Sequence, residues 1–65
     1  MKPQEKLDCI CRMITIVQKR ILESLNAIEK LPKTDSLHKW YLDYLKDNIY
    51  IQKRLVNYYN NNLKL

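Results

Sequence analysis

Glycine and phenylalanine are absent from this 65-residue chain, and proline occurs only twice. An average protein is about 7% glycine, so a chain of this length should carry roughly four or five. Tight hairpin turns, phosphate-binding loops and dinucleotide-binding turns all depend on glycine. The composition therefore disfavours a strand-rich fold and a nucleotide-dependent enzyme.

Metal ligands and nucleophiles are also few: the chain has one histidine, His38, and two cysteines, Cys9 and Cys11. On a helix these cysteines point about 200° apart, so a shared metal ion would need ligands from a second chain. Asp35, Ser36 and His38 are the residue types of a hydrolytic triad, but helix capping explains their position and nothing supplies an oxyanion hole. We expect no catalytic residue, no metal and no cofactor.

Long apolar runs are missing as well. No segment approaches the roughly 18 apolar residues of a membrane span, and the first residues are too polar for a signal peptide. Cys9 and Cys11 are too close in sequence for an ordinary disulfide. We expect a cytoplasmic protein with reduced thiols and no membrane contact. Its richness in lysine, asparagine, isoleucine and tyrosine is typical of low-GC coding sequences such as those of many phages and plasmids.

The residues that are present suit one small basic domain. Hydrophobic residues make up 46% of the chain and charged residues 29%, which is a globular balance, and 12 basic against 7 acidic residues give a net charge of +5. A chain this short buries only about 60% of its extended surface when it folds alone. We therefore expect marginal stability for an isolated copy.

Apolar residues in the first half follow helical spacing. Two interleaved rows recur every seven residues, with one polar member: Leu7, Ile14, Ile21 and Ile28, and Ile10, Val17, Ser24 and Leu31. This narrow stripe predicts a helix that packs lengthwise along another helix. Pro3 suits its first turn, and Pro32 disfavours helical geometry in the residue before it, so the predicted helix spans residues 3–31.

A loop over 32–35 and a second helix over 35–60 follow. Thr34, Asp35 and Ser36 are all good N-cap residues, and so short a connection forces the two helices to pack antiparallel. We expect the C-terminus after Asn60 to fray. The predicted fold is all-α: one antiparallel helical hairpin that dimerises into a four-helix bundle or docks on a partner.

Self-association or docking is expected because the apolar side of the second helix is too wide for one neighbour. Its apolar rows span about 160°, whereas one partner helix covers roughly 100°. We expect the first helix to bury the edge formed by Leu42, Leu45, Ile49 and Val56. The residues left over form the predicted partner or dimer interface: Tyr41, Tyr44, Ile51, Leu55 and Tyr58. Leaving five such side chains in water would forgo about 10 kcal/mol.

This surface predicts a non-enzymatic interaction protein, namely a regulator, inhibitor or adaptor. Tyrosine is enriched in protein interfaces, and positive charge on the second helix would steer the protein towards an acidic partner. An RNA- or DNA-binding dimer is the alternative, because basic residues recur along both helices and could track phosphates. The residues of these ridges are Arg12, Lys19, Lys39, Lys46 and Lys53.

Two short stretches, Gln4–Lys6 and Leu22–Asn26, are similar to parts of the first helix of the Rop family of plasmid RNA-binding proteins. The similarity covers less than half of the chain, and the two stretches need different offsets. Ile10 and Ile14 stand where the RNA-binding face of that family has asparagine and phenylalanine, and only Gln18 matches. The resemblance implies a dimeric hairpin architecture and by itself no function.

Overall fold

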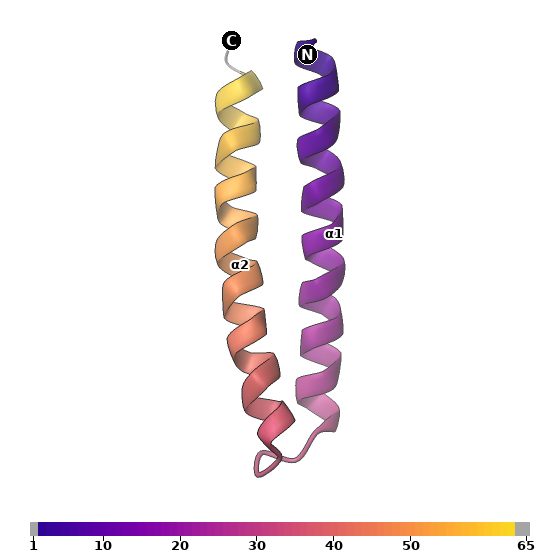
Figure 1. The fold of residues 1–65 in the computed structure, drawn as a ribbon, viewed down its shortest axis with the longest axis vertical. Helices are drawn as coiled ribbons and strands as arrows, with labels where there is room; N and C mark the ends of the chain where they lie inside the picture. The colour runs from indigo at the N-terminus through magenta and orange to yellow at the C-terminus, as the bar shows by residue number, and fades with distance from the viewer. Residues whose placement is uncertain (1, 64–65) are drawn as a thin grey trace.

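The computed structural model describes residues 2–63, which form two helices joined by a short loop (Figure 1). Helix α1 spans Pro3–Lys30 and helix α2 spans Ser36–Leu63. The helices lie side by side and antiparallel, so that the start of α1 and the end of α2 lie at the same end of the molecule. The predicted all-α helical hairpin is confirmed.

Local signals set most of the helix ends. Pro3 occupies the first turn of α1, where its missing N–H costs nothing. Leu31 is extended, with φ −88° and ψ 139°, which is the conformation that the following Pro32 requires. Helix α2 continues to Leu63, three residues beyond the predicted end, and the side-chain amide of Asn62 donates a 2.8 Å hydrogen bond to the carbonyl of Tyr58.

Asp35 caps the start of α2. Its carboxylate Oδ1 accepts a 2.9 Å hydrogen bond from the backbone N–H of Leu37, and its carbonyl accepts another from the N–H of His38. These bonds satisfy N–H groups that have no partner within the helix. Of the three candidate caps in the sequence, Asp35 is the one whose side chain makes this bond.

Replacing Asp35 with alanine should therefore destabilise the protein by about 1 kcal/mol. For a domain of this size that loss lowers the melting temperature by roughly 4–8 °C. Thermal unfolding followed by circular dichroism measures the change, and Thr34→Ala, at an exposed neighbouring position, is the control. Equal melting temperatures for the two variants would show that the cap contributes nothing.

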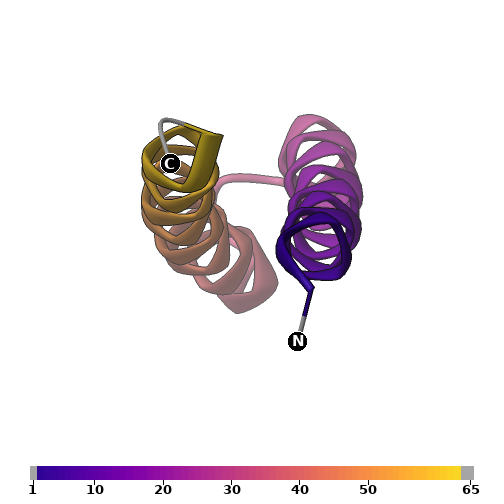
Figure 2. The ribbon, with the colours of Figure 1, turned by 90° about the horizontal axis from the view of Figure 1, so that it is seen from above.

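The hairpin is long and thin. It measures 48 × 14 × 14 Å, and its radius of gyration is 14.9 Å, against about 11 Å for a compact domain of this length. Viewed along its length, each helix has the other on one side and no further layer (Figure 2). Two helices can bury only one seam between them, so most of each helix surface faces water.

The seam on α1 matches the predicted stripe. Ile10, Val17 and Ser24 are buried, and the interleaved residues of the other row are half-buried. The hydroxyl of Ser24 is fully buried and donates a 2.8 Å hydrogen bond to the carbonyl of Arg20, so this polar residue is satisfied within its own helix.

The seam on α2 differs from the prediction. The buried and half-buried row of α2 is Tyr41, Leu45, Asn48, Gln52, Leu55 and Tyr59. The predicted edge is wrong in part, because Ile49 and Val56 are each 39% exposed. Helix α1 packs on the middle of the wide apolar side, and residues on both flanks of this seam, such as Leu42 and Tyr44, are half-buried. If α1 packed on one edge of this apolar side, the residues at the other edge would be fully exposed to water.

Candidate interaction surfaces

Because α1 packs on the middle of the apolar side of α2, an apolar face remains exposed on each side of the hairpin. Relative to the buried Asn48, Ile49 lies about 100° round the helix in one direction and Ile51 about 60° in the other. Both isoleucines are exposed. One contiguous leftover surface was predicted from the sequence; the structure instead has two surfaces, separated by the seam.

The aromatic face holds four of the five residues predicted as the interface. We define it as Trp40, Tyr44, Ile51, Leu55 and Tyr58 on α2. Tyr58 is 47% exposed and Ile51 41%, whereas Tyr44 and Leu55 are half-buried. Ile51, Leu55 and Tyr58 line one shallow groove. The remaining predicted interface residue, Tyr41, is half-buried in the seam beneath this face.

Trp40 extends this face towards the loop. Its ring stacks on that of Tyr44, with the centroids 5.0 Å apart and the planes 17° from parallel, and meets Tyr41 edge-on at the same centroid distance. Trp40 is 55% exposed. The interface predicted from the sequence did not include Trp40, although its spacing of four residues from Tyr44 is the usual signal for two side chains that touch.

Two cations border the aromatic face. The ammonium of Lys6, on α1, lies 5.0 Å from the ring centroid of Tyr58, and the guanidinium of Arg54 lies 5.8 Å from that of Tyr50. Both distances fit cation–π contacts. The sequence analysis assigned electrostatic steering to other lysines and missed Lys6, because contacts between helices are not visible in a single-helix projection.

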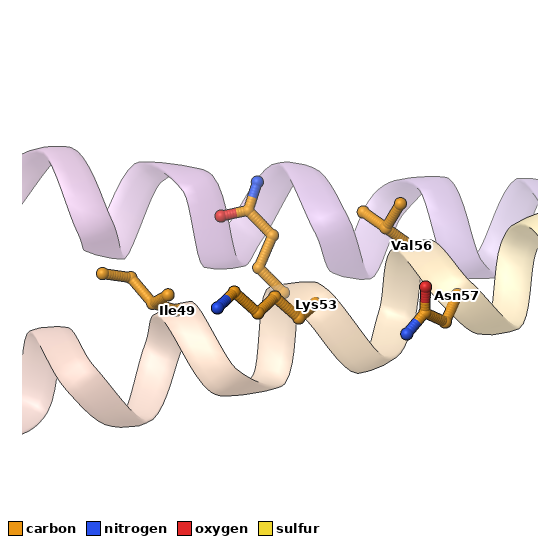
Figure 3. A pocket seen from close by; sticks show the side chains of 5 residues that line it. Ile49, Lys53, Val56 and Asn57 are labelled. Atoms are coloured by element: carbon orange, nitrogen blue, oxygen red, sulfur yellow. The ribbon is translucent and has the colours of Figure 1, made fainter.

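The aliphatic face lies on the other side of the seam. We define it as Leu22 and Leu25 on α1 with Ile49 and Val56 on α2, all of them exposed. Gln52 joins the two helices here, since it lines a hollow with Gln18 and Leu22 of α1 and a second hollow with Ile49 and Val56 (Figure 3). All four residues that define this face are aliphatic. Ile49 and Val56, its two residues on α2, lie seven residues apart.

The predicted basic ridges point away from each other. All five residues, namely Arg12, Lys19, Lys39, Lys46 and Lys53, are exposed. Lys19 lies about 200° round α1 from the buried Val17, and Lys46 lies about 200° round α2 from Asn48. The two ridges therefore occupy opposite outer sides of the hairpin, and one copy cannot present both of them to a single stretch of nucleic acid.

Tyr59 of α2 and Cys11 of α1 lie close to each other near the free ends of the two helices. Hydrogen bonding with the Cys11 side chain raises the pKa of Tyr59 above its ordinary value of 10.0, and the negative charges that Cys11 and Asp8 carry when ionised act in the same direction. A raised tyrosine pKa means that folding favours the neutral hydroxyl. The neutral Tyr59 hydroxyl therefore contributes stability that is fully present below pH 10.0 and is lost as the pH rises through the folded-state pKa.

Tyr59→Phe should remove this loss of stability at alkaline pH. Melting temperatures measured across the alkaline range should fall more steeply with pH for the unmodified protein than for Tyr59→Phe. Cys11→Ala should behave like Tyr59→Phe, because it removes the other partner of the bond. Parallel curves for all three proteins would contradict the assignment.

A metal site, a membrane-spanning helix and a disulfide find no structural support in residues 2–63. No three histidine, cysteine, aspartate or glutamate side chains gather as a metal site within this range. Neither helix has an apolar stretch long enough to cross a bilayer. Cys9 and Cys11 are exposed free thiols.

Comparison with known proteins adds no relative: no protein-family model, no curated protein sequence and no solved structure matches the chain. The case for a function therefore depends on the two faces and on the seam between them.

Proposed function

We propose that this protein is a small non-enzymatic interaction protein of the cytoplasm. Two hairpins pair into a four-helix bundle, and the aromatic face binds an acidic protein partner. The protein then acts as a regulator, inhibitor or adaptor by occupying the surface of that partner. The large area of apolar surface that a single hairpin leaves in water is the observation that carries the proposal.

The total accessible surface of the chain, polar and apolar together, is also large for its mass. A folded monomer of 7.9 kDa has an accessible surface of about 4,400 Å², whereas this chain exposes 5442 Å². The excess of about 1,000 Å² is comparable with the roughly 800 Å² that each partner contributes to a standard interface. Twelve of the described large apolar side chains are exposed, among them Trp40, Tyr50 and Leu22.

The chemistry of the aromatic face favours a protein as its ligand. Tryptophan, tyrosine and arginine are the residues most enriched at the energetic centres of protein interfaces. Here Trp40, Tyr58 and Arg54 lie along one side of one helix. Lys6 and Arg54 give the border of this face a positive charge, which suits a partner with carboxylates around an apolar groove.

A capture experiment at two salt concentrations tests the proposal. The tagged protein is incubated with nuclease-treated extract of the cells that make it. We expect one protein to be retained in a fixed molar ratio at low and at moderate salt, because an apolar contact is little affected by ions. Retention of nucleic acid in untreated extract, with a steep loss at moderate salt, would contradict the proposal and support the RNA- or DNA-binding alternative.

A further inference from the structure

We infer that the aliphatic face is where a second copy of this chain binds, through an antiparallel contact between the two α2 helices. This inference rests on the self-association proposed above and adds to it the face, the orientation and the register. The aromatic faces of both copies then remain free on the two outer sides of the dimer, available to partners.

Residue spacing favours the aliphatic face for self-pairing. Leu42, Ile49, Val56 and Leu63 recur every seven residues along most of α2, which is the repeat of helices that pack lengthwise on each other. Ile49 and Val56 are 39% exposed and Leu63 is 55% exposed, so the row has apolar area left to bury. The corresponding row on α1 contains Cys11 and Gln18 and is much less apolar.

The register follows from the symmetry of a two-fold dimer, in which one patch meets an identical patch. With the axis between residues 52 and 53, Ile49 of one copy lies opposite Val56 of the other, and Leu42 lies opposite Leu63. Every apolar residue of the row then meets an apolar residue. The chain as a whole exposes about 1,000 Å² more surface than a compact monomer of its mass, and a standard interface takes roughly 800 Å² from each chain.

The positive charge of Lys53 near the two-fold axis gives this dimer contact a characteristic salt dependence. Lys53 lines the same hollow as Ile49 and Val56, so the two copies bring like charges close to the axis (Figure 3). Added salt screens this repulsion. Dimerisation through the aliphatic face should therefore tighten as salt rises, which is the opposite of the salt response of nucleic-acid binding.

Sedimentation equilibrium on face-specific variants is the first test. The unmodified protein should have twice the 7.9 kDa chain mass, and Ile49→Lys combined with Val56→Lys should reduce it to the mass of one chain. The matched control is Ile51→Lys combined with Tyr58→Lys, which places two lysines on the aromatic face and should leave the dimer intact.

Cross-linking is the second test and does not depend on a destabilised variant. In a background of Cys9→Ser and Cys11→Ser, Lys53→Cys should form a disulfide between copies under mild oxidation. The control is Arg54→Cys, which also removes one cation but lies in the groove of the aromatic face, and it should stay unlinked.

The outcomes separate the two proposals. A dimer that survives the Ile49 and Val56 substitutions, or that Arg54→Cys links and Lys53→Cys does not, overturns the aliphatic contact while self-association stands. A single-chain mass for the unmodified protein at all concentrations overturns both.

Discussion

Replacing Asn48 with leucine is expected to raise the melting temperature by about 10 °C. Asn48 is 2% exposed, and its side-chain oxygen Oδ1 has no hydrogen-bond partner. A buried acceptor left unpaired costs about 1–3 kcal/mol, which leucine removes while adding apolar burial. The amide of Asn48 does donate a 2.7 Å bond to the carbonyl of Tyr44, but that carbonyl also accepts the helical N–H of residue 48.

Register should not suffer from this substitution. An asparagine in an apolar seam often fixes the pairing of two helices at a cost in stability. In this chain the loop between Lys30 and Ser36 already sets how α1 meets α2, so helicity and mass should stay unchanged.

Asn26→Leu is the matched control for this prediction. It makes the same exchange at an exposed site on α1 and reports the gain in helix propensity alone, which is at most about 0.7 kcal/mol. Thermal unfolding of both variants gives the comparison. If Asn48→Leu stabilises the protein no more than Asn26→Leu does, then Oδ1 is satisfied in the assembled protein and the seam is not strained at this point.

The second large effect concerns the partner. Ile51→Lys combined with Tyr58→Lys should weaken partner binding by about a thousandfold, because anchor residues at interface centres contribute about 2 kcal/mol or more each. Both side chains are exposed in the hairpin, so helicity should be kept, and loss of the contact between Lys6 and Tyr58 should cost at most about 1 kcal/mol of stability. Titration calorimetry or biolayer interferometry with the captured partner measures the loss.

Ile49→Lys combined with Val56→Lys is the matched control for this loss. It makes the same exchange on the same helix but on the aliphatic face, and each chain should keep its affinity for the partner. If the aliphatic variant loses the partner and the aromatic variant keeps it, the two faces have been assigned the wrong way round.

Local signals made the helices and the loop predictable from the sequence. Pro3, Pro32 and Asp35 act on their own neighbourhood, so their effect is visible without knowing what packs where. The stripe on α1 was equally predictable, because it is narrow and offers one way to pack.

The seam on α2 was not predictable, because its wide apolar side offers several seats for α1. Residue types favoured the purely aliphatic edge at Ile49 and Val56, yet the chain buries Asn48 and half-buries Gln52 instead. The position of α1 on α2 depends on how much apolar surface stays exposed on both sides of the seam. The sequence of one helix alone does not show this. The division of the leftover surface into two faces follows from this position, and so does the contact of Lys6 with Tyr58.

One measurement tests the central claim, that a single hairpin is not the final state of this chain. Sedimentation equilibrium of the unmodified protein over a wide range of concentrations should give twice the 7.9 kDa chain mass, falling towards one chain on dilution together with the melting temperature. A mass of one chain throughout, with a high melting temperature that does not depend on concentration, would contradict the account.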